Sequence, residues 1–257
     1  MRRPNWYERL PRPAIIAHRG ASLDAPENTL AAFNLAISQG ADAVEFDVML
    51  CGSGEVVVIH DENLNRTTGG EGPVGDTPLD EIKQQDAGSW FDAEFAGETV
   101  PSLDEVLESI GLRTYLNIEL KNFSSPFDDL ADKTAAAVLQ HQLQDRIFFS
   151  SFNPFNFRKI KRILPDSPVG LLTARGMANP AFLRLARLFG PYEALHPHVD
   201  DVTPEWIARS HKAGKPVFSY VCNEPDEILR GLSAGLDGLI TDNPVLARSK
   251  LQAFIHS

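Results

Sequence analysis

Short apolar runs alternate with longer amphipathic segments along most of the chain. Short runs that are apolar throughout are typical of strands buried in a parallel sheet, whereas the longer segments have the period of a helix. The predicted strands are Ala14–Ala17, Ala43–Met49, Tyr115–Leu120, Ile147–Ser150, Val169–Leu172, Glu193–His196, Pro216–Val221 and Gly238–Thr241. The predicted helices are Thr29–Gln39, Asp128–His141, Asn156–Leu164, Pro180–Phe189, Pro204–Ala213, Pro225–Ala234 and Pro244–Phe254. This α/β pattern favours a (β/α)8 barrel, the TIM barrel, over an open sheet.

One connection, between Met49 and Tyr115, is much longer than the others. It begins with an apparent hairpin strand, Glu55–His60, and continues through a polar, glycine-rich stretch. Long connections of this kind are often functional loops or small subdomains. We therefore expect a single domain over residues 1–257, with a small insertion between strands 2 and 3, at about residues 61–112, over the barrel mouth.

The charge balance narrows the classes of partner. With 24 Lys and Arg against 35 Asp and Glu, the net charge is −11, which argues against a nucleic-acid partner held through phosphates. Cys51 and Cys222 are too few for a disulfide framework. The basic start, Met1–Arg9, lacks the apolar segment of a signal peptide, and no apolar run approaches the ~20 residues that span a bilayer. We expect a cytoplasmic protein without stable membrane association, and the sequence leaves homo-oligomerisation open.

Polar residues stand where several predicted strands end or approach their ends. In a barrel of this kind these positions face the active-site mouth. The side chains delivered there are His18, Arg19, Glu45, Asp47, His60, Glu119 and Lys121.

The carboxylates among them predict a metal site. Glu45 and Asp47 lie on one face of an otherwise apolar strand, and a buried carboxylate without a cation or hydrogen-bond partner is costly. With Glu119 they form an oxygen-only set, which favours Mg²⁺ or Ca²⁺, with Mn²⁺ acceptable, over Zn²⁺.

The remaining residues indicate chemistry on an anionic ester. His18 and His60 each follow an apolar strand, and two histidines beside a metal-bound phosphate would supply a general acid and a general base. Arg19 and Lys121 would bind phosphate oxygens or, alternatively, pair with the metal carboxylates. Together these groups predict metal-assisted hydrolysis or elimination, most simply of a phosphodiester.

A series of motifs in the chain resembles the glycerophosphodiester phosphodiesterase family, most closely its cytosolic bacterial branch. The motifs that carry the resemblance are Ala17-His18-Arg19-Gly20, Pro26-Glu27-Asn28-Thr29, Glu45-Phe46-Asp47-Val48, His60-Asp61, Leu64-Asn65-Arg66-Thr67-Thr68, Ala87-Gly88-Ser89-Trp90-Phe91, Pro101-Ser102-Leu103, Asn117-Ile118-Glu119-Leu120-Lys121 and Gly235-Leu236-Asp237-Gly238-Leu239-Ile240-Thr241-Asp242. They are dense in the first half of the chain and in the last strand, and sparse between Asn122 and Lys215.

The resemblance implies a TIM barrel that hydrolyses glycerophosphodiesters to glycerol 3-phosphate and an alcohol. It implies Glu45, Asp47 and Glu119 as metal ligands, His18 and His60 as the acid/base pair, and Arg19 and Lys121 as groups near the phosphate. The family often has a tryptophan in strand 7, within a Trp-Thr-Val-Asn motif. Tyr220 of Tyr220-Val221-Cys222-Asn223 takes its place here as a substrate-binding wall, although Val221 and Cys222 depart from the pattern.

Two other functions remain open from the sequence. A related barrel could act on an intact lysolipid or lipid, in the manner of a phospholipase D or C, and an inactive barrel could bind a ligand only. From the acidic charge, we expect preference for water-soluble, deacylated diesters and rejection of a long acyl chain on the glycerol.

Overall fold

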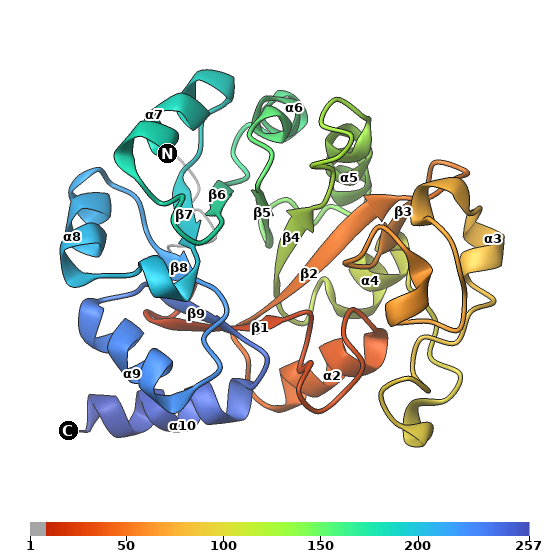
Figure 1. The fold of residues 1–257 in the computed structure, drawn as a ribbon, viewed down its shortest axis with the longest axis horizontal. Coiled ribbons are helices and arrows are strands. Elements are labelled where there is room, and N and C mark those ends of the chain that lie inside the picture. Colours follow the sequence, from red (N-terminus) through yellow and green to blue (C-terminus); the bar gives the residue numbers. More distant parts are fainter. Residues whose placement is uncertain (1–8, 257) are drawn as a thin grey trace.

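The computed structural model describes residues 9–256, in which a parallel barrel is surrounded by helices (Figure 1). The basic N-terminal segment, apart from Arg9, lies outside the described residues. Within residues 9–256, every helix is too short or too polar to cross a bilayer.

The strands follow one another around the barrel in the order β7-β6-β5-β4-β2-β1-β9-β8. Every neighbouring pair in this order is parallel, and bridges at Leu195–Val217 and His198–Tyr220 join β7 to β8. The strands are β1 (Ala14–His18), β2 (Ala43–Leu50), β4 (Tyr115–Leu120), β5 (Ile147–Ser151), β6 (Val169–Thr173), β7 (Ala194–Pro197), β8 (Phe218–Ser219) and β9 (Gly238–Thr241). This architecture confirms the predicted TIM barrel.

Helices cover the outside of the barrel (Figure 1). They are α2 (Leu30–Ser38), α4 (Leu103–Ile110), α5 (Leu130–Gln140), α6 (Phe155–Ile163), α7 (Pro180–Phe189), α8 (Pro204–Lys212), α9 (Pro225–Ala234) and α10 (Pro244–Ile255). Four of them, α7 to α10, begin with proline in the first turn, where its missing N–H costs nothing. The predicted spans of α7 and α9 are reproduced to the residue.

The core has two layers, which explains why the strands are apolar on both faces. The larger layer lies between the sheet and the helices, and includes Val44, Phe46 and Val48 of β2. The smaller one fills the inside of the barrel with residues such as Ile16, Phe148, Ala194, Phe218 and Ile240. Polar side chains that point inward therefore stand out against an apolar interior.

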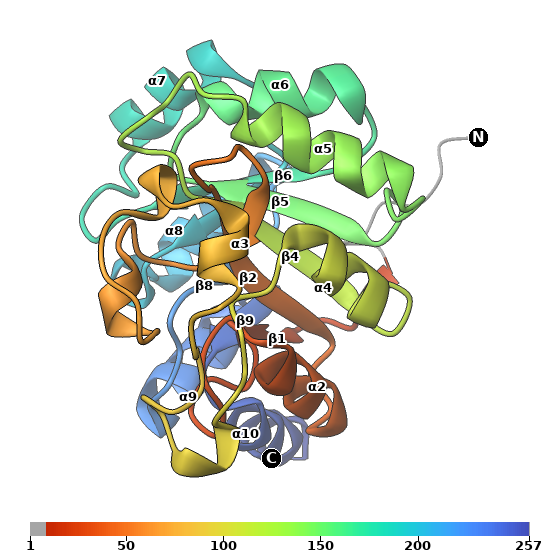
Figure 2. The ribbon, with the colours of Figure 1, turned by 90° about the vertical axis from the view of Figure 1, so that its right-hand side faces the viewer.

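The long connection after β2 folds around a small core of its own. It begins with β3 (Val56–Val58), antiparallel to β2, and continues through η1 (Leu64–Arg66), η2 (Val74–Asp76), α3 (Leu79–Ile82) and η3 (Ala93–Phe95). Its core is formed by Met49, Cys51, Val57, Ile59, Leu64, Val74, Ile82, Ala87 and Val100. Figure 2 shows this orange and yellow segment beside the barrel strands.

The helix that ends this connection, α4, belongs to the barrel. Its apolar residues Leu103, Val106, Leu107 and Ile110 join the main core, although the predicted insertion at 61–112 includes them. The start of α4 is fixed by a capping box between the side chains of Ser102 and Glu105. The helix is only eight residues long and lies in a long polar connection. Its helical periodicity is therefore too short to separate it from the insertion in the sequence.

Candidate active site

Three buried carboxylates converge at the mouth of the barrel. Glu45 and Asp47 point inward from β2, and the strand register places Asp47 beside Glu119 of β4. One oxygen from each residue lies within 4.8 Å of the others. This is the set predicted from the sequence, and its hard oxygen donors suit a divalent cation such as Mg²⁺ or Ca²⁺.

Burial and mutual repulsion shift the pKa values of the three carboxyl groups in this cluster. Burial and the neighbouring carboxylates of Asp47 and Glu119 raise the pKa of Glu45. Burial also raises the pKa of Glu119. Burial would raise the pKa of Asp47 too, but the cations of Arg19 and Lys121 lower it to about 2. A bound cation would hold all three groups in the ionised form.

Arg19 is held by carboxylates on two sides. Its backbone N–H donates to Glu45 Oε2 at 3.0 Å, and its Nη1 donates to Glu27 Oε1 at 2.8 Å. Its Nε lies 3.3 Å from Asp47 Oδ2. Burial alone would lower the pKa of Arg19, but Asp47, Glu27 and Glu45 raise it further above its ordinary value. Arg19 is therefore paired with Asp47 and bonded to Glu45, the alternative left open by the sequence.

Asn28 fixes Asp47 in place through both of its side-chain atoms. Its Nδ2 donates to Asp47 Oδ2 at 2.9 Å, and its Oδ1 accepts from the Asp47 backbone N–H at 3.2 Å. Asn28 was not predicted as a site residue. The only signal for it is its place in the Pro26–Thr29 motif.

His18, at the end of β1, is oriented by Asp242, which follows β9. Nδ1 of His18 lies 2.6 Å from Asp242 Oδ1. Asp242 also accepts from Ser22 Oγ at 2.9 Å and from Asn223 Nδ2 at 2.5 Å. Although burial would raise the pKa of Asp242, these hydrogen bonds lower it to about 2. Nε2 of His18 is thereby the ring nitrogen left for proton transfer.

His60 is held between Asp61 and Lys121. Its Nδ1 lies 2.5 Å from Asp61 Oδ1, and its Nε2 lies 3.0 Å from Lys121 Nζ. An ammonium can only donate, so Nε2 accepts and Nδ1 carries the proton. Burial and the cations of Arg19 and Lys121 lower the pKa of His60 despite the attraction of Asp47. The imidazole is therefore held in its neutral form.

Lys121 connects the second histidine to the acidic cluster. Besides His60, its Nζ lies 3.1 Å from Glu119 Oε1 and 3.8 Å from Asp47 Oδ1. Burial alone would lower the pKa of Lys121, but the two carboxylates raise it. The ammonium therefore stays charged beside the three carboxylates.

A further arginine links the loops that carry the two histidines. Arg66 donates to both oxygens of Glu27 at 2.8 Å and to Asp61 Oδ2 at 2.5 Å. Glu27 follows β1 and also binds Arg19, whereas Asp61 follows β3 and binds His60. This network, which the sequence did not predict, holds the two loops together at the mouth.

Comparison with known proteins identifies the family of the chain. The sequence model of the glycerophosphoryl diester phosphodiesterase family matches residues 18–246, from His18 to beyond Asp242. The chain belongs to this family.

Individual members of the family are similar over nearly the whole length. The chain is 40% identical to the glycerophosphodiester phosphodiesterase of Caldanaerobacter subterraneus subsp. tengcongensis, over 90% of this chain and 94% of that one. It superposes on a phosphodiesterase from Oleispira antarctica, solved in complex with the product sn-glycerol-3-phosphate, with a TM-score of 0.86 and 35% identity, covering 97% of this chain and 100% of that one. For the glycerophosphodiester phosphodiesterase of Agrobacterium tumefaciens, the TM-score is 0.79 and the identity 33%, with 92% and 99% covered.

Tyr220 of this phosphodiesterase lies among aromatic rings rather than in the hydrogen-bonded cluster. Its hydroxyl donates to the backbone oxygen of Thr173 at 2.9 Å, and burial raises its pKa. Its ring meets that of Phe152 edge to face, with centroids 6.1 Å apart. The structure thus joins six of the predicted site residues, Arg19, Glu45, Asp47, His60, Glu119 and Lys121, in one bonded cluster. His18 lies on the neighbouring strand beside Glu45, and Tyr220 lies in an aromatic wall.

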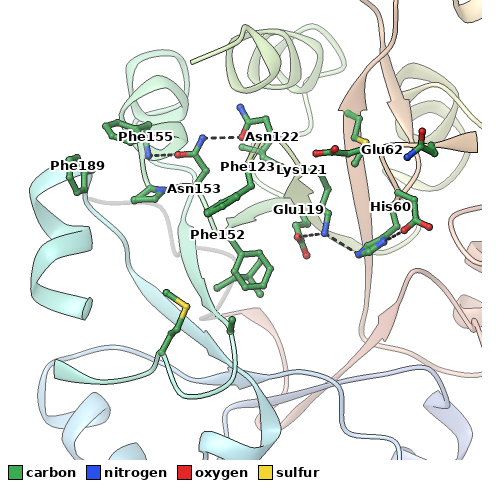
Figure 3. Close-up of a pocket in the computed structure, with 18 of the residues that line it drawn as sticks. His60, Glu62, Glu119, Lys121, Asn122, Phe123, Phe152, Asn153, Phe155 and Phe189 are labelled. Atoms are coloured by element: carbon green, nitrogen blue, oxygen red, sulfur yellow. Dashed lines mark hydrogen bonds and ion pairs between the residues drawn. The ribbon is translucent and has the colours of Figure 1, made fainter. Parts of the chain in front are cut away.

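The mouth of the phosphodiesterase opens into a pocket of about 820 Å³ (Figure 3). His60, Glu119 and Lys121 line the end at the acidic cluster. Figure 3 shows Phe152 and Phe123 beyond Glu119, and Phe155 and Phe189 farther along the same side. The pocket therefore joins a charged end, at the acidic cluster, to an apolar end.

Proposed function

We propose that this phosphodiesterase hydrolyses glycerophosphodiesters, with the help of a divalent metal ion, to glycerol 3-phosphate and an alcohol. The observation that carries the proposal is the buried cluster of Glu45, Asp47 and Glu119 between His18 and His60. The glycerol 3-phosphate in the related Oleispira antarctica structure supports this product.

The three carboxylates would hold Mg²⁺, Ca²⁺ or Mn²⁺, because all donors are oxygens and Glu45 tends to keep its proton without a cation. When bound, the ion supplies Lewis acidity toward a phosphoryl oxygen. Arg19 and Lys121 bind the remaining phosphate charge, and the ring of Tyr220 contributes to the wall beside the substrate.

The histidines move the protons. Neutral His60 suits the general base, with its protonated Nδ1 held by Asp61. Its Nε2, which accepts from Lys121, becomes free to take a proton from water when the Lys121 ammonium turns to the phosphate. His18 suits the general acid, because Asp242 holds its Nδ1 and leaves Nε2 for transfer of a proton to the leaving group. The segment at about 61–112 is proposed as the insertion that delivers Asp61 and Arg66 to the mouth. Location in the cytoplasm stays a prediction.

The test is turnover of metal-stripped enzyme on a panel of glycerophosphodiesters that differ in the alcohol. Mg²⁺, Ca²⁺ or Mn²⁺ is restored in turn, and released glycerol 3-phosphate is measured. We expect no product in excess chelator and recovery with at least one ion. Full turnover in chelator would contradict the metal role.

The acid/base roles have a separate test. His18→Ala and His60→Ala should each lower kcat by about 10²-fold or more while metal affinity is kept. Metal titration beside kinetics checks this. A variant that lost its metal affinity, but recovered full activity at high metal concentration, would identify that histidine as a ligand instead.

A further inference from the structure

A second cavity, of about 330 Å³, lies between α7 and α8, which are neighbours on the outside of the barrel (Figure 1). It shares no lining residue with the pocket at the barrel mouth. Helix α7 separates the two, since Phe182 and Phe189 line the mouth pocket whereas Leu183 lines this cavity. We name it the basic cavity, because four of its lining residues are cations: Arg184, Arg187, Arg209 and Lys215.

Hydrogen bonds hold the walls of the basic cavity in place. Nε1 of Trp206, in α8, donates to the backbone oxygen of Ala178, just before α7, at 2.6 Å. The hydroxyl of Tyr192, which follows α7, donates to the backbone oxygen of Leu183 at 2.9 Å. Nζ of Lys215, in the loop before β8, donates to the backbone oxygen of Tyr192. These bonds join α7 and its flanking loops to α8 and to the loop before β8, so the cavity is a fixed part of the fold.

The positive charge of the basic cavity is not balanced by acids. No Asp or Glu lines it, and within residues 9–256 none of its four cations forms an ion pair with a carboxylate. Glu193 acts on Lys215 from a longer distance, but it is already paired with Lys161 at 2.9 Å. The whole chain has 35 acidic and 24 basic residues, so a cavity lined only by cations goes against its charge balance. An anion would neutralise this local excess.

Lys215 and Arg187 are held beside the same aromatic ring. Lys215 is buried, and its Nζ lies 4.0 Å from the centroid of Tyr192. The guanidinium carbon of Arg187 lies 5.9 Å from that centroid. Burial and the charge of Arg187 lower the pKa of Lys215 to about 8. The ring attracts both cations, whereas the cations repel each other, and an anion bound beside them would stabilise both.

The lining indicates the chemical class of the ligand. Guanidinium groups bind phosphate oxygens through pairs of parallel hydrogen bonds, and four cations favour a doubly charged group. A phosphomonoester carries close to two negative charges at neutral pH, whereas a phosphodiester carries one. The volume of about 330 Å³ is at the lower end of the range for small-molecule sites. The rest of the lining is mostly apolar, with Pro180, Leu183, Leu195, Trp206 and Ala213.

We propose that the basic cavity binds a small phosphomonoester whose alcohol part is apolar and about the size of one aromatic ring. The three arginines bind the phosphate, and the apolar part packs against the wall that includes Leu183 and Trp206. This site is separate from the catalytic cluster and does not depend on the proposed function.

The experiment is calorimetric titration of the full chain, with no metal added, with phenyl phosphate. We expect phenyl phosphate to bind at least about tenfold more tightly than inorganic phosphate, because its ring is removed from water. It should also bind more tightly than benzoate, which has the same ring but a single charge. If phenyl phosphate bound no better than inorganic phosphate, the cavity would be an ion-binding surface only and the proposal would be overturned.

Two variants of α8 separate the cavity from general charge attraction. Arg209→Gln should weaken the binding of phenyl phosphate by about tenfold, because a charge-assisted hydrogen bond is lost. Lys212→Gln is the matched control, since Lys212 is exposed, lies on the same helix and does not line the cavity. It should leave the affinity nearly unchanged. Equal losses in the two variants would overturn the proposal, and thermal melts check that both are folded.

A third variant tests whether the probe binds at the barrel mouth instead. Lys121→Gln changes the cation that lines the mouth pocket, so it should not alter the affinity for phenyl phosphate. Loss of binding in Lys121→Gln, with Arg209→Gln unaffected, would place the probe beside the acidic cluster and overturn the proposal.

Discussion

Each histidine of the site has Nδ1 fixed by a carboxylate, but the two carboxylates have different surroundings. Asp242 accepts from Ser22 and Asn223 besides His18, whereas Asp61 is bound by Arg66. Carboxylates that hold a catalytic histidine set its tautomer and the direction of its free nitrogen. The activity should therefore depend on residues that do not touch the substrate.

Asp242→Asn should lower kcat by about 10- to 100-fold, because a neutral amide does not fix the tautomer and orientation of the His18 ring. Metal affinity should stay the same, because Asp242 is outside the acidic cluster. The measurements are steady-state kinetics and metal titration. Asp200→Asn, which alters the carboxylate 3.5 Å from His198, is the control and should leave kcat near that of the parent enzyme.

Glu119→Gln should weaken metal binding by at least about tenfold, because an amide oxygen does not offset the charge of the cation. The metal-free variant should melt at the same temperature as the parent or higher, since one of three crowded carboxylates is removed. Metal titration and thermal melts measure both effects. The exposed acid Asp80, changed to Asn, provides the control. Unchanged metal affinity in Glu119→Gln would exclude it as a ligand.

At the scale of elements, the loop from β1 to α2 is shaped by residues with positive φ. Arg19 and Asn28 have φ of 56° and 59°, and Gly20 has φ of 88°. A Cβ on Gly20 would lie 2.7 Å from the backbone of Ala32 in α2. The loop is therefore packed directly on the helix, and this packing fixes where His18 and Arg19 point.

Gly20→Ala should destabilise the fold by roughly 2–4 kcal/mol, because it adds a steric clash to the cost of positive φ. Gly40 provides a matched control, since its φ is 78° but nothing lies within 4 Å of an added Cβ. Gly40→Ala should cost only about 1 kcal/mol. Urea unfolding measures the free energy of unfolding of both variants. If the two variants lost equal stability, α2 would have moved away from the added Cβ and the predicted clash would be wrong.

At the scale of the whole molecule, one ionisable group is enclosed by the apolar inside of the barrel. His196 of β7 is fully buried between the rings of Phe148 and Phe218, with centroid distances of 5.0 and 5.5 Å. Neither ring nitrogen has a partner among residues 9–256. Burial lowers the pKa of His196 to about 3. His196 lies outside the acidic cluster. Burying its ring nitrogens without hydrogen-bond partners lowers the stability of the barrel.

The stability of the protein should therefore decrease in acid. The folded state keeps His196 neutral, whereas the unfolded chain binds a proton below about pH 6.5, so the free energy of unfolding falls from there toward pH 3. The loss from this group by pH 5 is up to ~2 kcal/mol. His196→Leu should remove it, and His256→Leu, at an exposed position, should not. Unfolding in urea at pH 7 and pH 5 measures the difference between the variants.

The sequence by itself determined the barrel and the set of charged residues that meet at its mouth. The apolar strands are buried on both faces, so their pattern is local, and the helix starts are marked by proline or capping residues. Glu45 and Asp47 are conspicuous because charge interrupts an apolar strand. Alternation along β2 and β4 also shows which carboxylates share a face.

Only the tertiary structure decided which groups hold the active residues and what lies beside them. Asp242 is 224 residues from His18 in the chain, and Arg66 is 39 residues from Glu27. In the sequence, nothing distinguishes such partners from other polar residues, because they meet only when the barrel closes. The apolar end of the pocket is likewise built from separate βα units, and the sequence does not distinguish its aromatic residues from core residues. Local patterns determine the elements and their faces, whereas contacts between distant segments depend on how the barrel closes.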